Sequence, residues 1–255
     1  MILIITPSLQ LKGNNMKNAL KTSLLASSCM VAAAAQAHVS IASGPHFVNK
    51  SSIIELSIPH GCTDEVSGSE DTVRIVAKVP SSITSVYAID AVFGQATVVA
   101  MEGEHSYNEI TWVKAAGTER DSDTQYYKVS FRGKLPDAAF STVFIPTTQY
   151  CINDSEQEIS VSWDVESGGH DHSSSTEGNP APSLMVMPAR SPGWNQYTTG
   201  TDQHLHDMSI FNDAEIVWWD DAAYSSNTVT QELIEAEGKS TLSEIHDNAS
   251  FWVKY

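Results

Sequence analysis

His38 would combine two metal-binding groups if it became the first residue of the chain. It follows Ala35-Gln36-Ala37, a small-x-small pattern that signal peptidase cuts. Its free α-amino nitrogen and its imidazole Nδ1 could then close a six-membered chelate around one metal ion. Both groups lose their proton readily near neutral pH, and such nitrogen donors suit Cu(II), which heads the divalent affinity order. We therefore predict a copper site at His38; the alternative is that His38 is simply the residue after the cut.

Two pairs of histidines are also spaced to share a metal ion. His170 and His172 are separated by one residue, as are His204 and His206, and such positions point to the same side of an extended chain. Both pairs lie in polar sequence typical of flexible loops, so we expect weak metal binding at most. Three other histidines have no partner nearby in sequence and are expected to be surface or structural residues: His46, His105 and His246.

Residues 1–37 have the features of an export signal. Lys17 and Lys21 supply the positive charge, and residues 23–35 form an apolar stretch too short to cross a bilayer. We expect translation to start at Met16 and residues 1–37 to be removed. The protein should then be periplasmic or secreted and should not span a membrane.

The charge balance excludes one class of partner. The chain has 14 Lys and Arg against 31 Asp and Glu, which gives a formal net charge of −17. An acidic surface of this strength repels phosphate backbones, and no cluster of basic residues offsets it. We expect no nucleic-acid binding.

The cysteines agree with export. Cys29 lies inside the signal, which leaves Cys62 and Cys151 to form a disulfide in an oxidising compartment. Two alternatives stay open. Cys62 and Cys151 could be free buried thiols, and Cys29 could be a lipidation site.

Short alternating runs predict an all-β sandwich followed by a small α+β extension. From His38 to about Met187, apolar and polar residues alternate in runs broken by Gly, Pro, Ser and Asp. We expect a long loop over residues 168–182, a linker over residues 189–203 and a small C-terminal module over residues 204–255. In that module, residues 227–237 have the composition of a helix ended by Gly238.

Several motifs, in order, resemble the YcnI-like family of exported bacterial copper-binding proteins. The segment Ile58-Pro59-His60-Gly61-Cys62 follows the histidine start, and a later segment from Phe144 to Cys151 precedes Trp163. The likeness covers residues 38–188. It implies a β-sandwich of the immunoglobulin/fibronectin or cupredoxin-like type that binds Cu(II) through one brace-forming histidine.

The resemblance also implies a ligand set. His38 would be the chelating residue, and Trp163 matches a tryptophan that lies close to the metal. The acidic ligand of other members does not carry over cleanly, because His60 stands at the corresponding turn. His60 could replace the carboxylate, with Asp64 or Glu65 as rivals. Pro59 and the expected disulfide would restrict the motion of His60.

Three hypotheses for function follow. The first is copper trafficking or tolerance, with a membrane copper transporter or a copper chaperone as the implied partner. The second is an oxidative copper enzyme similar to polysaccharide monooxygenases, and the third is a metal-free interaction module. We expect the protein not to be an enzyme, because the sequence carries no Gly-x-Ser-x-Gly, phosphate-loop or His-Glu-x-x-His motif.

Overall fold

The computed structural model describes residues 38–64, 68–103, 105–118, 125–153, 155–166 and 178–255. The expected export signal, Glu65 and the His170 and His172 pair lie outside these ranges. Within them, no helix has both the length and the apolar character needed to cross a membrane.

Alternation along the long strands explains why two sheets form. In β3 (Ser51–Ile58), Ile54, Leu56 and Ile58 are buried, and in β10 (Tyr127–Lys134) the buried residues include Val129 and Phe131. Because neighbouring side chains of a strand point to opposite faces, each of these strands has one apolar face to cover. One buried cluster contains residues of both sheets, so the apolar faces pack against each other.

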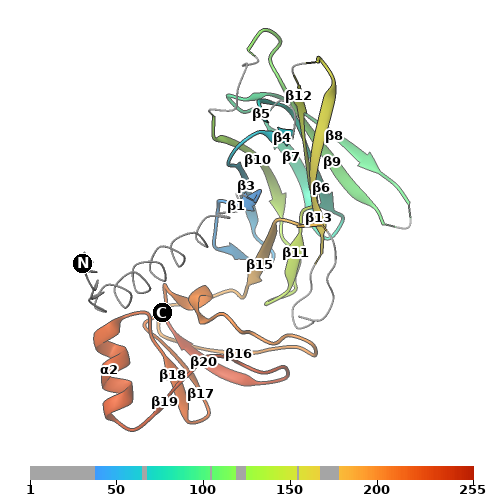
Figure 1. Ribbon diagram of the computed structural model, residues 1–255. Helices are drawn as coiled ribbons and strands as arrows, with labels where there is room; N and C mark the ends of the chain where they lie inside the picture. The colour runs from blue at the N-terminus through green and yellow to red at the C-terminus, as the bar shows by residue number, and fades with distance from the viewer. Residues whose placement is uncertain (1–37, 65–67, 104, 119–124, 154, 167–177) are drawn as a thin grey trace, which may run out of the picture. The chain divides into compact units, whose positions relative to one another are not determined.

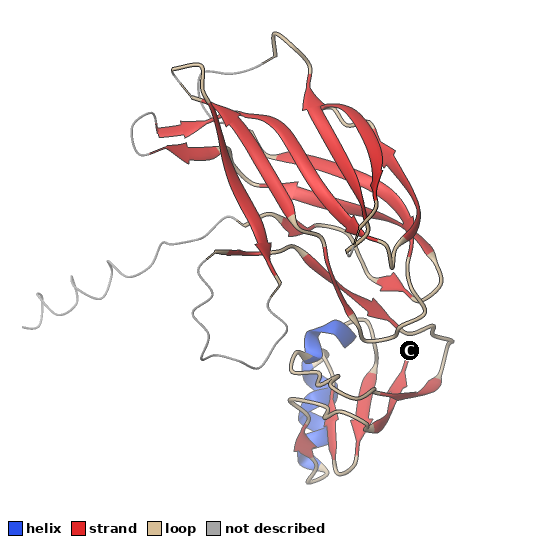
Figure 2. Ribbon diagram, turned by 90° about the vertical axis from the view of Figure 1, so that its right-hand side faces the viewer, coloured by secondary structure: helices blue, strands red, loops and turns tan. Residues whose placement is uncertain are grey.

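The first sheet has the order β1-β3-β10-β7 and is antiparallel throughout. The second has the order β14-β13-β12-β6-β9-β8, and only the short edge pair β13–β14 is parallel. Figures 1 and 2 show their long strands running side by side. The remaining strands of the two sheets are β1 (Ser40–Ile41), β7 (Thr84–Ile89), β14 (Asn179–Pro180), β13 (Glu158–Val165), β12 (Thr147–Ile152), β6 (Thr72–Pro80), β9 (Tyr107–Lys114) and β8 (Gly94–Met101).

Shorter strands complete this region. They form a three-stranded sheet of order β11-β15-β2 and a β4–β5 hairpin. Their bounds are β11 (Thr142–Phe144), β15 (Ser183–Met187), β2 (His46–Phe47), β4 (Cys62–Asp64) and β5 (Gly68–Glu70). The predicted all-β sandwich is confirmed by these sheets and their shared core.

The predicted disulfide between Cys62 and Cys151 is present and buried. It joins the start of β4 to β12, and the two Cα atoms are 5.9 Å apart across a sequence separation of 89 residues. A crosslink over so long a loop removes much of the conformational freedom of the unfolded chain. The bond therefore fixes the segment that carries His60, two residues before Cys62.

The C-terminal region forms a five-stranded sheet of its own with one described α-helix and a 3-10 helix, η1 (Met208–Phe211). The sheet has the order β16-β20-β17-β18-β19, and α2 (Thr228–Ala236) lies beside it in Figure 2. The Asn227 side chain accepts hydrogen bonds from the backbone N–H groups of Val229 and Thr230, which begins the helix, and Gly238 has a φ of 75° just past its end. The strands are β16 (Trp194–Thr198), β17 (Ile216–Trp219), β18 (Ala222–Tyr224), β19 (Ser240–Thr241) and β20 (Ser250–Lys254).

This region differs from the expected linker and module in two ways. Residues 189–203 were expected to be a linker, but β16 lies within them and pairs with β20 along its whole length. The buried cluster around Phe211 and Phe251 also contains Phe140 and Met187 from the sandwich strands and their loops. About 50 residues are too few to build a large core alone, so the shared cluster supplies part of it.

Candidate metal centre

His38 lies at the end of the β1–β3 pair. Val39 is only 2% exposed and belongs to the sandwich core, which anchors the chain directly after His38. Ser40 lies opposite Ser57 in the antiparallel register of β1 and β3. The residues before Ser40 and the residues after Ser57 therefore leave the strand pair at the same end. His38 itself is half-buried. Its place is therefore set by the strand and the core.

His60 follows that same end of β3. Its Nδ1 lies 2.5 Å from the Gly61 carbonyl oxygen, which can only accept a hydrogen bond. Nδ1 therefore carries the proton, and the lone pair of the neutral ring is on Nε2. A histidine whose tautomer is fixed in this way presents a defined metal-binding nitrogen.

Gln149 links the His60 turn to the core. Its Nε2 donates to the His60 carbonyl oxygen at 2.7 Å and to Thr72 Oγ1 at 2.6 Å. Its Oε1 is buried and has no hydrogen-bond partner among the residues that the structure describes. A buried acceptor without a partner is costly and calls for a ligand, water or ion to satisfy it. Gln149 thus ties the His60 turn to Thr72 and leaves one buried acceptor unsatisfied.

The acidic rivals of His60 are partly outside the described residues. The backbone of Asp64 ends β4, and Glu65 follows it. Across the hairpin, Cys62 lies opposite Glu70, which is only 3% exposed. No sequence pattern singled out Glu70, because it lies in a polar stretch, and its burial appears only in the fold.

Trp163 lies in the sandwich core. It is 4% exposed, and its partner across the strands is Thr147 of β12. Gln149 occupies the next inward-facing position of β12, so Trp163 is one diagonal step from the residue that holds the His60 turn. The fold thus links Trp163 to this turn through β12. The described contacts include none that joins the side chains of His38, His60 and Trp163 directly.

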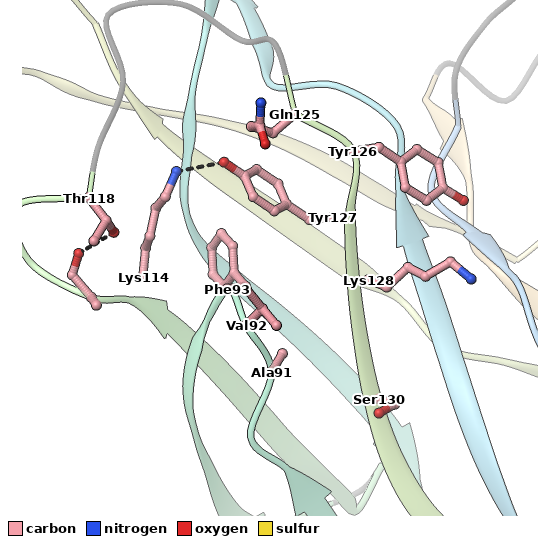
Figure 3. Close-up of a pocket in the computed structure, with 11 residues that line it drawn as sticks. Ala91, Val92, Phe93, Lys114, Thr118, Gln125, Tyr126, Tyr127, Lys128 and Ser130 are labelled. Carbon is pink, nitrogen blue, oxygen red and sulfur yellow. Dashed lines mark hydrogen bonds between the residues drawn. The ribbon is translucent and has the colours of Figure 1, made fainter.

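A separate pocket of about 560 Å³ has the wrong chemistry for a metal ion. Figure 3 shows Lys114, Tyr127 and Lys128 along it, and none of its described lining residues is His, Cys, Asp or Glu. Lys114 forms a buried ion pair with Asp71 and donates a hydrogen bond to the Tyr127 hydroxyl at 2.6 Å. Burial raises the pKa of Tyr127 above its ordinary value, which keeps this hydroxyl neutral. The described lining of this pocket therefore supplies none of the side chains that usually bind a metal ion.

The other described histidines lie in three different settings. His46 is buried at 4% exposure, whereas His105 is exposed. His204 and His206 do not lie in a separate flexible arm, because Leu205 between them is buried and pairs with Ile245. His246 has no partner nearby in sequence, but its ring centroid lies 4.5 Å from that of His204 in the fold.

Comparison with known proteins shows the family. Residues 38–186, more than half of the chain, match the family described as Domain of unknown function (DUF1775). The chain belongs to this family.

A similar solved structure is that of an uncharacterized protein from Nocardia farcinica, described as having an immunoglobulin-like fold. The identity is 16% and the TM-score 0.45, over 60% of this chain and 99% of that chain. No curated protein matches the sequence.

Proposed function

We propose that this protein is exported and binds Cu(II) through the α-amino nitrogen and Nδ1 of His38, for copper trafficking or tolerance. The observation that supports it most is the β1–β3 register, which brings His38 to the strand end that leads into the His60 turn. The described side chains fit such a site chemically, because two histidines with nitrogen donors lie at one end of the same strand pair. Cu(II) would be the ion that the protein binds and passes on. The protein would supply the nitrogen donors and hold them in place.

The buried position of Val39 supports His38 as the chelating residue. Val39 is buried directly after His38, so the amine and the imidazole are attached to a fixed backbone. A fixed backbone lowers the entropy that two donors lose when they close on one ion. The chelate requires a free amine, so the proposal includes cleavage after Ala37.

The ligand that completes the site is proposed to be His60 through Nε2. Support comes from its hydrogen bond to Gly61, which leaves Nε2 as the donor, and from the nearby disulfide. Asp64 and Glu65 remain its rivals, and Glu70 joins them because it is buried opposite Cys62. Trp163 is proposed to shield the metal from one side rather than to bind it.

The proposal is tested by titrating Cu(II) into the chain that begins at His38 and into a matched chain that retains Ala37. Both carry His206→Ala and His246→Ala, so that the C-terminal histidines do not contribute. We expect one tightly bound Cu(II) and a loss of affinity of about 100-fold or more when Ala37 is retained, because changes outside the ligands alone cost about 10- to 100-fold. Equal affinity in the two chains would contradict the chelate.

A second titration identifies the completing ligand. His60→Ala should weaken Cu(II) binding, whereas His105→Ala, on the same sandwich, should leave it unchanged. If His60→Ala binds Cu(II) as tightly as the parent, His60 is not the completing ligand. The Asp64→Asn, Glu65→Gln and Glu70→Gln variants then show which carboxylate completes the site.

A further inference from the structure

Two segments 40 residues apart meet at one backbone bridge in the C-terminal region. Leu205 and Ile245 exchange both backbone hydrogen bonds, each at 2.9 Å. Their side chains are 2% and 0% exposed and belong to the cluster around Phe211 and Phe251. Because adjacent side chains in extended segments point to opposite sides, the residues flanking Leu205 and Ile245 turn away from this core together.

The four flanking residues can all bind metals. In the antiparallel register of the bridge, His204 lies opposite His246, and His206 lies opposite Glu244. The rings of His204 and His206 are stacked, with centroids 3.8 Å apart and planes 20° apart, so one ring must turn for both nitrogen lone pairs to reach the same ion. One face of the bridge therefore holds three imidazoles and one carboxylate.

The donor atoms converge on a small volume. Oε2 of Glu244 is 3.2 Å from His204 Nε2 and 3.5 Å from His206 Nδ1, and its Oε1 is 3.9 Å from His246 Nε2. The ligand atoms of His204, His206 and Glu244 all lie within 4.8 Å of one another. Zinc bonds of roughly 2.0–2.2 Å place tetrahedral ligands about 3.3–3.6 Å apart. The distances from Glu244 to His204 and His206 are near this range, whereas His246, at 3.9 Å from Glu244, would have to move closer to bind the same ion.

The surroundings favour a cation and hold the donors in place. The side-chain exposures are 22% for His204, 47% for His206, 44% for Glu244 and 52% for His246, so an ion could enter from solvent. The Trp219 ring lies 5.2 Å from that of His246 and restricts its motion. An adjoining cavity of about 840 Å³ is lined by His204 and His206 and by three acids, Asp202, Asp207 and Asp247.

We propose that His204, His206, Glu244 and His246 form a second metal site, which takes one divalent transition-metal ion, Zn(II) or Cu(II). Imidazole and carboxylate donors suit these ions, and three histidines with one carboxylate satisfy four-coordinate zinc without a further ligand. The site uses no backbone amine, so it does not depend on cleavage or on the His38 chelate. Binding would also add a crosslink between two segments that the Leu205–Ile245 bridge and the hydrogen bond from Thr199 to the His246 carbonyl oxygen already join.

The test is a Zn(II) titration of the His38–Tyr255 chain carrying His38→Ala, which removes the other proposed site. A competing chromogenic chelator reports the affinity, and Co(II) in place of zinc reports the coordination number through its visible spectrum. We expect one equivalent of Zn(II), a four-coordinate Co(II) spectrum and a higher unfolding temperature with zinc.

Three variants and a control decide whether the cluster holds the ion. His206→Ala, His246→Ala and Glu244→Gln should each weaken zinc binding by about 100-fold or more, because second-sphere changes alone cost roughly 10- to 100-fold. His105→Ala, an exposed histidine on the sandwich, should bind zinc like the parent. Circular dichroism of each variant checks that the fold is retained, and the half-exposed side chains of His206 and His246 leave no core cavity when removed.

Two results would overturn the proposal. One is the absence of zinc binding at micromolar concentrations in the folded parent. The other is a folded His206→Ala, His246→Ala or Glu244→Gln protein that binds zinc as tightly as the parent. The cluster would then be only a set of histidines hydrogen-bonded to Glu244.

Discussion

The two regions of this protein place their histidines by different means. In the sandwich, His38 depends on the position of the chain end, and His60 depends on a turn fixed by Gln149 and the disulfide. In the C-terminal region, four side chains are brought to one face by the pairing of Leu205 with Ile245, which a hydrogen bond from Thr199 to the His246 carbonyl oxygen supports. The first arrangement needs a processing event to gain its amine, whereas the second is complete in the folded chain.

This difference separates the two proposed sites experimentally. Changes near the disulfide should alter copper binding at His38 and leave zinc binding at the C-terminal histidines intact. Changes at the Leu205–Ile245 bridge should have the opposite effect. The two regions share a buried cluster that includes Phe140 and Met187, so their stabilities are coupled even if their metal affinities are not.

The largest expected effect on stability comes from Cys62→Ala combined with Cys151→Ala. Loss of a crosslink across 89 residues should lower the free energy of unfolding by up to about 4 to 5 kcal/mol. Urea unfolding followed by circular dichroism measures it. The Cu(II) affinity of the folded variant should also fall, because the His60 turn gains freedom, and the Zn(II) affinity should not change. A loss of less than about 1 kcal/mol would mean that the unfolded chain is already compact near these residues.

A loss of similar or smaller size is expected for Leu205→Ala. Removing this buried side chain leaves a cavity and should cost about 2 to 5 kcal/mol. Zn(II) affinity should fall with it, since the bridge positions the donors, while Cu(II) affinity at His38 stays constant. Leu233→Ala is the matched control, because Leu233 lies on α2 with 62% exposure and its truncation should change stability by about 0.5 kcal/mol or less. Unchanged zinc affinity in Leu205→Ala would show that the bridge does not position the cluster.

The smallest effect concerns His46, the buried histidine of the sandwich. Burial lowers the pKa of its imidazole below the ordinary value of 6.5, although its hydrogen bond with Ser43 acts against this. Below pH 6.5 the imidazole of His46 is therefore protonated more readily in the unfolded chain than in the folded chain. Acid thus lowers the free energy of unfolding. The slope from one proton is at most about 1.4 kcal/mol per pH unit. Urea unfolding between pH 7 and pH 5 should show a smaller loss in His46→Gln than in the parent, and equal losses would assign the acid sensitivity to other groups.

Much of the fold could be predicted from sequence. Period-two alternation locates strands such as β13 and β15, and the composition of residues 227–237 with Gly238 after it locates α2. The pairing of Cys62 with Cys151 followed from the cysteine count. The strand β16 was missed, because Trp194–Thr198 lies among Pro, Gly and Ser residues and is defined by its partner β20.

The C-terminal site could be predicted only in part. The His204 and His206 pair was visible, but Glu244 and His246 lie 40 residues away and enter only through the bridge register. One signal was available: His-Leu-His and Glu-Ile-His each place an apolar residue between two metal-binding ones. Near the His60 turn, Gln149 and Glu70 are buried by tertiary packing, which the sequence pattern does not predict.

The central claim is that the exported chain begins at His38 and holds copper there. Native mass spectrometry of the protein exported by copper-supplemented cells, as the parent and as His38→Ala, tests it most directly. We predict a parent chain that starts at His38, lacks two hydrogens because of the Cys62–Cys151 bond, and carries one more copper ion than His38→Ala does. A chain that starts at another residue, a blocked amine, or equal copper content in the two proteins would contradict the claim.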